Sequence, residues 1–463
     1  MPPGARGRNC PLGFYIRRQD RHYYGEKEAK MKQRRGVGLS RKGAGIPYIL
    51  LSLGIIALLL PPLAKADEPY HLGHCMAFTG TGAVSSKECK TGVDLAVEEI
   101  NKQGGFLGKH PIKLFVRDDL GKPDIGVRES KDLILRDKVR AIVGTYSSAV
   151  ALAIEEVCYE YKVLHIPANS NTEAMTVDNY SPYTYQVVPN TYMQAKAQAI
   201  AVARIARQKG WKTFVTLGQD YEWAQNTTKA FLAFMNQFYP EMKLIKQYWP
   251  KLGEKEYSAY ITSIMADKPD FVYGCISGTD GFAWMSQGKP YGFFEKFPYS
   301  CLLSLTEMIE AKDIVPRGVI AVSRAPFYAH MDIPMMANFV KNYRAKYNVY
   351  PSDFAAMHYD AVYALKQGVE KAGSIDTEKV KNAMKGMSIN TVRGKLAFRK
   401  IDNMLNCQSY VGIVADDPQY PFPICHDLMI VSGEDSWRPE SEIPAIREKA
   451  ELAKKRSPQE LKF

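Results

Sequence analysis

Short apolar runs alternate along this chain with stretches in which apolar residues recur every three to four positions. Runs rich in β-branched residues, such as Ala141–Val143 and Val163–Ile166, predict strands, and stretches such as Glu88–Gln103 predict amphipathic helices. This alternation predicts an α/β fold in which parallel sheets are flanked by helices. We expect strands at 74–78, 112–116, 141–143, 163–166, 213–217, 244–248, 271–275, 300–303 and 319–322, and helices at 88–103, 126–136, 149–161, 195–209, 224–238, 257–266, 278–289, 334–347 and 352–372.

The elements form two strand–helix series followed by a different tail. The first series ends after the strand at 163–166, and the second begins near Met193. From 395 to 431 the chain turns to short strand-like pieces rich in Pro, Asp and Cys, and after Glu434 it becomes charged and helical. Residues 67–463 are too many for one ordinary hydrophobic core, so we expect two lobes.

Residues 1–66 have the pattern of a leader with a signal peptide. The apolar run at 48–63 follows basic residues at 34–42 and is closed by Ala64-Lys65-Ala66. A basic region, an apolar region and an A-x-A site together predict secretion, with cleavage after Ala66. The alternative is a retained single-span anchor, for which the run is short.

The leader accounts for most of the net charge of +12. Residues 1–66 hold 13 of the 61 Lys and Arg and 3 of the 49 Asp and Glu, which leaves 48 basic and 46 acidic side chains in the rest. The exported part is therefore close to neutral, and nothing in its charge predicts binding to nucleic acid or to an anionic membrane surface.

Seven cysteines follow the leader, and none forms a C-x-x-C pair. Since histidine is also scarce, we expect neither a zinc site nor another metal site. Export permits disulfides, and the odd number leaves at least one thiol unpaired. We expect Cys407–Cys425 and Cys275–Cys301 as the first candidates for pairing, although spacing alone leaves the connectivity open.

Two loops carry the clearest chemistry. Gly144–Ala153 and His165–Thr176 each follow a predicted strand and offer small polar side chains where a helix can start. Two such loops at one sheet edge would cradle a small anion such as a carboxylate, because helix N-termini present free N–H groups and positive potential. Ser147 and Ser148 could also simply cap the helix that follows. Neither loop holds a nucleophile–base pair, so we predict binding and no enzymatic activity.

The loop TGTGAVSS, at 79–86, has the appearance of a nucleotide loop. It lacks the third glycine of a dinucleotide fingerprint. The acids at 118–119 follow the loop by about 36 residues, whereas a dinucleotide site has its acidic residue roughly 20 residues after the glycines. We therefore expect no cofactor. The favoured interpretation is a loop that faces the ligand through Ser85 or Ser86, with a plain tight turn as the alternative.

Four stretches of this sequence resemble the periplasmic solute-binding proteins of ABC importers, type I fold, in the leucine/isoleucine/valine-binding family. FTGTGAVSS and the helix and strand after it, up to 119, look like the family's opening strand, loop and helix. AIVGTYSSAVALAIEEVCYEYKVLHIPANSNTEAMT is similar to its two ligand loops, and VTLGQDYEWAQNTTKAF to the first strand, loop and helix of its second lobe. PSDFAAMHYDAVYALKQGVEKAGSIDTEKVKNAMKGM resembles its late helix pair.

The resemblance implies two lobes joined by three crossovers, with the ligand in the cleft between them. The N-terminal lobe would comprise 67–190 and 326–390, and the C-terminal lobe 191–325 and 391–463. The lobes would close on the ligand by hinge bending. The implied partners are a small-molecule solute and the permease subunits of an ABC transporter, in the periplasm.

The resemblance also implies roles for individual residues. In the family, a serine of the first loop and a carbonyl and hydroxyl of the second grip an amino acid; these match Ser147 with Ser148, and Ala168 with Ser170, with Thr172 nearby. An aromatic residue of the second lobe matches Tyr221. The acid that pairs with an ammonium falls near Glu307, but LSLTEM departs from the family's glycine-flanked acid. Thr279, after the strand at 271–275, is a further candidate, with helix capping as its alternative.

We therefore expect an exported receptor that captures an amino acid, an amide or a related small carboxylate and delivers it to an ABC permease. The first alternative is a binder of aromatic or aliphatic carboxylates for the same kind of importer. The second is an extracellular ligand sensor. Binding without turnover would separate all of these from an enzyme, since a ligand that binds only the native state raises its stability.

Overall fold

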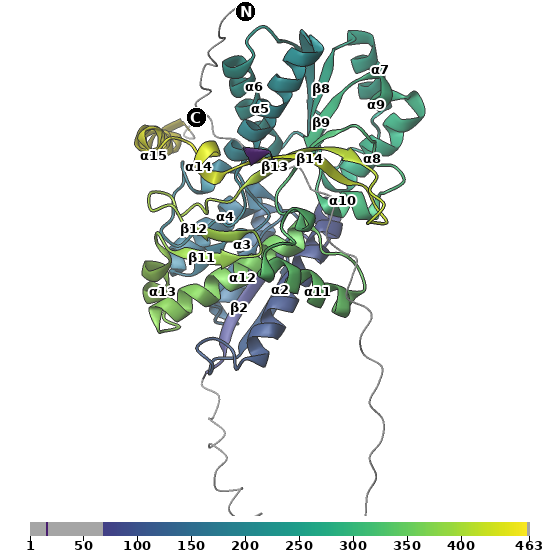
Figure 1. Cartoon of the computed structure of the whole chain (residues 1–463). Helices are drawn as coiled ribbons and strands as arrows, with labels where there is room; N and C mark the ends of the chain where they lie inside the picture. Colours follow the sequence, from purple (N-terminus) through teal and green to yellow (C-terminus); the bar gives the residue numbers. More distant parts are fainter. Residues whose placement is uncertain (1–14, 17–67, 461–463) are drawn as a thin grey trace, which may run out of the picture.

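The computed structural model describes residues 15–16 and 68–460 (Figure 1). The apolar run, the basic residues before it and the cleavage site of the predicted signal peptide lie outside the described residues. Within the described residues, no helix is long and apolar enough to cross a membrane.

The first sheet has four parallel strands in the order β3 (Ile112–Asp118), β2 (Tyr70–Met76), β4 (Ala141–Gly144) and β5 (Leu164–Ile166). Side chains alternate between its two faces, as the pleat of a strand requires. Ala141 and Val143 join the core cluster that contains α2 (Ala83–Lys102) and α12 (Asp353–Ala372), whereas Ile142 joins the cluster of α3 (Pro123–Leu135) and α4 (Ser148–Tyr161).

The second sheet has eight strands in the order β1 (Tyr15–Ile16), β14 (Ile424–Val431), β13 (Ser409–Ala415), β10 (Ile320–Ser323), β9 (Tyr299–Leu302), β8 (Phe271–Cys275), β6 (Thr213–Gly218) and β7 (Lys243–Tyr248). The five strands from β10 to β7 are parallel, as predicted. β13 and β14 are antiparallel, because a short connection joins them and a short connection permits only an antiparallel pair. The helices of this lobe are α5 (Thr191–Lys209), α6 (Glu222–Phe238), α7 (Ser258–Asp267), α8 (Gly278–Gly288), α9 (Phe293–Lys296) and α10 (Leu305–Glu310).

The chain passes between the two sheets three times: after β5, after β10, and after the hairpin of β11 (Ser388–Thr391) and β12 (Gly394–Ala397). Between the second and third passages come α11 (Pro334–Tyr347), α12 and α13 (Thr377–Met384). α12 packs against α2 and α13 against α12, at the end of the molecule opposite α7 and α9 (Figure 1). The two-lobed α/β fold is therefore confirmed. The hairpin lies across the boundary that we expected at residue 390.

Most predicted elements form within a few residues of their expected ends, and several begin earlier, among them β2 at Tyr70, α2 and α5. α2 begins at Ala83 and not at 88, so that Ser85 and Ser86 lie in its first turn and not in a loop. α5 begins at Thr191 and not at 195, because the side chain of Asn190 caps it by accepting a hydrogen bond from the amide of Met193 at 3.0 Å.

The C-terminal segment returns from the second sheet to the first lobe. After β14 come α14 (Gly433–Ser436) and α15 (Ile443–Glu460). The guanidinium of Arg438 donates to both carboxylate oxygens of Glu173, at 2.7 and 2.8 Å, and lies 4.1 Å from the ring centre of Tyr192. Arg447 donates to the carbonyls of Thr176 and Val177, each at 3.1 Å. This segment therefore forms a non-covalent link between the lobes.

The seven cysteines of residues 68–460 are all buried and free, so neither expected disulfide forms. Cys301 lies opposite Gly274 in the β8–β9 register, and Cys275, one residue further, therefore faces the other side of the sheet. Cys425 pairs with Val414 at the turn end of β13–β14, whereas Cys407 precedes the opposite end of β13.

Candidate functional site

A narrow cavity of about 30 Å³ lies between the lobes, where the carboxyl ends of the parallel strands meet. Space of this size holds one or two water molecules, so the side chains around it lie close together. The first lobe contributes Ser85, Tyr146, Ser148, Asn169, Asn171 and Phe354, the second contributes Tyr221, Trp223, Ser277, Leu302 and Glu307, and Arg324 lies on the segment that passes between them.

The two serine-containing loops are joined to each other by Thr145. Its hydroxyl donates to the carbonyl of Ser147 and to the hydroxyl of Ser170, both at 3.2 Å, and its carbonyl accepts from the Ser170 amide at 2.8 Å. The turn needs Gly144, whose φ is +136°, because a Cβ there would lie 2.2 Å from the carbonyl oxygen of Cys75. The loops are thus held as one unit at the edge of the first sheet.

Four of the nine predicted ligand-binding residues line this cavity: Ser85, Ser148, Tyr221 and Glu307. Ser85 was expected on a loop and reaches the cavity from the first turn of α2. Ser148 is the first residue of α4, and Tyr221 immediately precedes α6.

The other five predicted residues do not line the cavity. Ser147 precedes α4, but its side chain makes no capping hydrogen bond. Ala168 and Ser170 are buried behind the lining. Thr172 donates to the carboxylate of Glu222 at 3.0 Å, and Thr279 is exposed and donates to Asp280 at 3.3 Å.

The carboxyl group of Glu307 is engaged by its own helix. Its Oε2 accepts from the amide of Ser304 at 3.0 Å and also from the Ser304 hydroxyl, which forms a capping box at the start of α10. Burial raises the pKa of Glu307, and the hydrogen bonds from Ser304 oppose that rise. Oε2 is thereby committed to the start of α10, and only Oε1 is left for a partner such as an ammonium.

Arg324 is the cation of the cavity, and our sequence analysis missed it. Its Nη1 donates to the backbone carbonyl and the side-chain oxygen of Asn169, at 2.9 and 3.0 Å, and its Nη2 donates to Gln194 at 3.3 Å. Burial lowers the pKa of Arg324 to about 10, so the guanidinium stays charged at neutral pH. The available signal was its position, directly after a predicted strand and two residues before Pro326.

Aromatic side chains form the remaining walls of the cavity. They are Tyr146 and Phe354 from the first lobe and Tyr221 and Trp223 from the second. Burial raises the pKa of Tyr146 to about 12 and that of Tyr221 well above its ordinary value, so both phenols are neutral at physiological pH. The cavity therefore combines apolar walls with a few polar groups, as small-molecule sites do.

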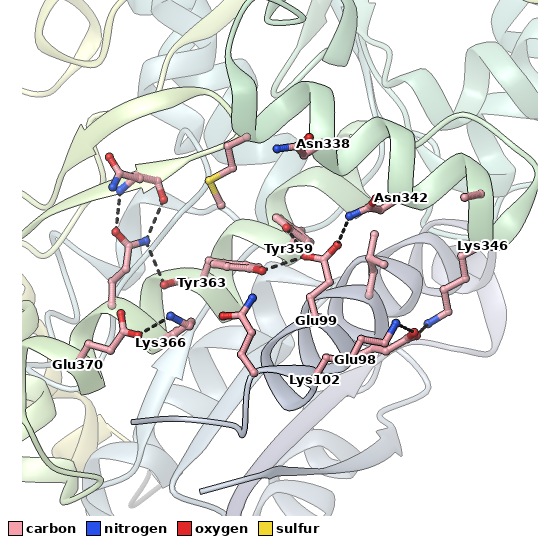
Figure 2. Close-up of a pocket in the computed structure, with 16 residues that line it drawn as sticks. Glu98, Glu99, Lys102, Asn338, Asn342, Lys346, Tyr359, Tyr363, Lys366 and Glu370 are labelled. Carbon is pink, nitrogen blue, oxygen red and sulfur yellow. Dashed lines mark hydrogen bonds and ion pairs between the residues drawn. The ribbon is translucent and has the colours of Figure 1, made fainter. Parts of the chain in front are cut away.

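A larger groove of about 1170 Å³ lies elsewhere, on the outside of the first lobe between α2, α11 and α12 (Figure 2). Its lysines are paired with acids, and its remaining acid, Glu99, is held by hydrogen bonds from neutral side chains. Glu99 accepts from Tyr359 at 2.5 Å, Tyr363 at 2.9 Å and Asn342 at 2.7 Å, and Figure 2 shows Glu98 between two lysines and Lys366 beside Glu370. Its charges therefore need no ligand, and we take the interlobe cavity as the candidate site. The described residues contain no cluster of potential metal ligands.

Comparisons with known proteins identify relatives of this chain. A relative from Rhizobium johnstonii, the Leu/Ile/Val-binding protein BraC3, is 27% identical over 77% of this chain and 94% of its own length. An amino acid binding protein of Pseudomonas aeruginosa is 24% identical over 82% of this chain and 97% of its own length.

Solved structures share the fold. A solute binding protein of an ABC transporter from Rhodopseudomonas palustris, in complex with 3,4-dihydroxy benzoic acid, superposes with a TM-score of 0.69, 20% identity and coverage of 81% of this chain and 100% of that one. The leucine binding protein LivK of Thermotoga maritima superposes with a TM-score of 0.68 and 19% identity, over 78% and 98% of the two chains. The model of the periplasmic binding protein family matches residues 69–418, so the chain belongs to this family, the solute-binding proteins of ABC importers.

Proposed function

We propose that this protein is an exported receptor that captures a small organic carboxylate in the interlobe cavity and delivers it to the permease of an ABC importer. The observation that carries the proposal is the composition of the cavity, which draws polar and aromatic side chains from both lobes around one buried cation. A solute held in this way would contact both lobes at once. Its binding would then favour the arrangement in which the lobes are close together.

The proposal includes export. Removal of the leader after Ala66 would release a protein that begins at Asp67, just before β2. The lobes would comprise 67–190 with 326–390 and 191–325 with 391–463, with the β11–β12 hairpin at the last boundary. Ser85, Ser148 and Tyr221 would contact the solute directly, and Ser147, Ala168, Ser170 and Thr172 would support them from the loops behind.

Relatives are named for two classes of solute. BraC3 is named as a Leu/Ile/Val-binding protein, and structures from Rhodopseudomonas palustris are complexes with 3,4-dihydroxy benzoic acid, benzoate and 4-hydroxybenzoate. The aromatic walls of this cavity and the engaged carboxyl of Glu307 favour the second class. We further propose that the solute is bound and released without chemical change.

Thermal unfolding of the protein against a panel of amino acids, amides, aliphatic acids and aromatic acids tests the proposal. A solute at 100 times its dissociation constant raises the free energy of unfolding by about 2.7 kcal/mol, which a shift in melting temperature reports. The solute should be recovered unchanged after incubation. A panel without any shift, together with no small molecule in the native mass spectrum of the purified protein, would contradict the proposed function; consumption of the solute would indicate an enzyme.

A further inference from the structure

Three arginines are buried among the described residues, and Arg324 differs from the other two. Arg393 forms an ion pair with Asp360, and Arg399 forms one with Asp402. The Arg324 guanidinium contacts only neutral oxygens, those of Asn169 and Gln194. A buried charge is costly without a close counter-ion, and the carboxyl groups of Asp353 and Glu307 favour the charged form of Arg324 without forming the direct ion pair that the other two sites possess.

Asp353 favours the charged form of Arg324 but forms no ion pair with its guanidinium. Asp353 lies close to the backbone of Arg324, where its Oδ2 accepts from the Ser323 hydroxyl at 2.5 Å, the Arg324 amide at 2.8 Å and the Ala325 amide at 3.3 Å. It therefore holds the segment that passes between the lobes. In the described part of the chain, no carboxylate forms an ion pair with the Arg324 side chain.

The guanidinium of Arg324 has N–H groups that make no hydrogen bond to any described residue. Of its five N–H groups, three donate to Asn169 and Gln194. Nε is buried and has no partner among the described residues, and one hydrogen of Nη2 is also left. Two N–H groups on neighbouring nitrogens are the arrangement that a carboxylate accepts in a bidentate pair.

Trp223 supplies a second unsatisfied donor in the same cavity. Its side chain is 4% exposed, and its indole Nε1 has no hydrogen-bond partner in the described structure. Buried indole N–H groups usually find an acceptor. Among the fully buried side-chain atoms of the lining, the acceptor without a partner is Oδ1 of Asn171, a neutral oxygen that suits a hydroxyl and cannot neutralise an ammonium.

We infer that Arg324 and Trp223 receive the carboxylate of the solute, and that the solute is an aromatic or branched aliphatic acid without an ammonium group. This inference rests on the proposed function and specifies its solute class. Because the cavity of about 30 Å³ is smaller than such an acid, the lobes must stand further apart around the solute; its carboxylate then faces the segment between the lobes, and its apolar body packs against Tyr146, Tyr221 and Phe354. An amino acid is rejected because its ammonium finds Arg324 in the lining and an acid already engaged by Ser304.

Calorimetric titration with matched probes tests the inference. The probes are 3-phenylpropionate against phenylalanine and 4-methylpentanoate against leucine, since each pair differs by the ammonium alone. We expect at least one acid to bind 100-fold or more tightly than its amino acid. An amino acid that binds as tightly as its partner overturns the inference and leaves the proposed function standing; failure of all four probes, with no small molecule in the native mass spectrum, overturns both.

Two variants locate the carboxylate. Trp223→Phe keeps an aromatic ring and removes only the N–H group, and Arg324→Gln removes the charge. We expect about tenfold weaker binding of the acid by Trp223→Phe and no measurable binding by Arg324→Gln. Trp437→Phe is the matched control, because it removes another unpartnered indole N–H that lies outside the cavity. If Trp223→Phe is folded by circular dichroism and binds the acid with wild-type affinity, the assignment of the carboxylate to Arg324 and Trp223 is overturned. This outcome decides the matter even if Arg324→Gln fails to fold.

Discussion

Gly278 lies so close to Tyr146 that a Cβ on the glycine would be 2.8 Å from the tyrosine hydroxyl oxygen. The same Cβ would be 2.5 Å from the carbonyl oxygen of Thr81, and the backbone φ of Gly278 is +64°. Gly278 begins α8 of the second lobe, whereas Tyr146 and Thr81 belong to the first. The hydroxyl of Tyr146 lies 3.4 Å from that of Ser277, so the lobes meet at this point without room for another atom.

Gly278→Ala should therefore hold the lobes apart and weaken solute binding. A steric conflict of about 1–3 kcal/mol in the closed arrangement corresponds to a loss of affinity of about tenfold to a hundredfold. Calorimetry with the bound acid measures the loss. Gly373→Ala is the control: φ there is +59°, so the backbone strain is similar, but a Cβ meets nothing within 4 Å and affinity should be unchanged. Equal affinities in the two variants would argue against closure at Gly278.

The pair of Arg438 and Glu173 predicts a stabilising role for the C-terminal segment. Both side chains are largely buried, at 21% and 14% exposure, and the pair is bidentate. Arg438→Ala should lower the free energy of unfolding by roughly 2 kcal/mol, because the carboxylate of Glu173 loses two charged hydrogen bonds. Urea unfolding measures it. Arg136→Ala removes an exposed pair with Asp132 and should cost under about 0.5 kcal/mol; similar losses would contradict the link.

His165 predicts a pH dependence of stability. It is fully buried without a side-chain partner, and burial lowers its pKa from 6.5 to about 3. Below pH 6.5 the imidazole of His165 is therefore protonated in the unfolded chain but stays neutral in the folded protein. Because the unfolded state binds the additional proton, this residue destabilises the fold as pH falls. The free energy of unfolding of His165→Met, measured relative to that of the wild type, should therefore rise by about 2 kcal/mol when the pH falls from 7 to 5. Urea unfolding at both values tests this, and a difference that is constant with pH would contradict it.

Glu307→Gln separates the two solute classes. The amide oxygen can still accept from Ser304, so α10 should keep its cap. Affinity for the acid should be unchanged or a few-fold tighter, because one like charge is removed from the cavity lining. Calorimetry with 3-phenylpropionate and phenylalanine measures both, with the exposed Glu295→Gln as control. A large loss confined to the amino acid would restore Glu307 as the partner of an ammonium.

Local pattern predicted the elements well, because alternating strands and helices each bury one face. The helix at Pro334–Tyr347 forms at the predicted residues. The first turn of α2 was missed since Ser85 and Ser86 carry none of the apolar periodicity that marks the rest of the helix; Ser85 lines the cavity instead. Apolar periodicity predicts which face of a helix packs against the core. It does not predict a helix end whose residues are polar because they line a binding site.

The site was only partly predictable for the same reason. Ser148 and Tyr221 lie where the loops after two predicted strands meet the next helices, so strand order brought them to the cavity edge. Arg324 owes its burial to Asn169 and Gln194, which are 155 and 130 residues away in the sequence. No local pattern records such a contact. The predicted disulfide between Cys275 and Cys301 was wrong for a similar reason. Strand register decides on which face of the sheet each side chain lies, and the sequence spacing does not record it.

Hydrogen–deuterium exchange with and without the bound acid tests the central claim most directly. A solute between the lobes should slow exchange in segments of both: 145–148 and 169–172 in the first, 221–223 and 302–307 in the second, and 323–325 between them. The groove of Figure 2 should exchange as before. Protection confined to α2, α11 and α12 around that groove, with the interlobe segments unchanged, would contradict the account.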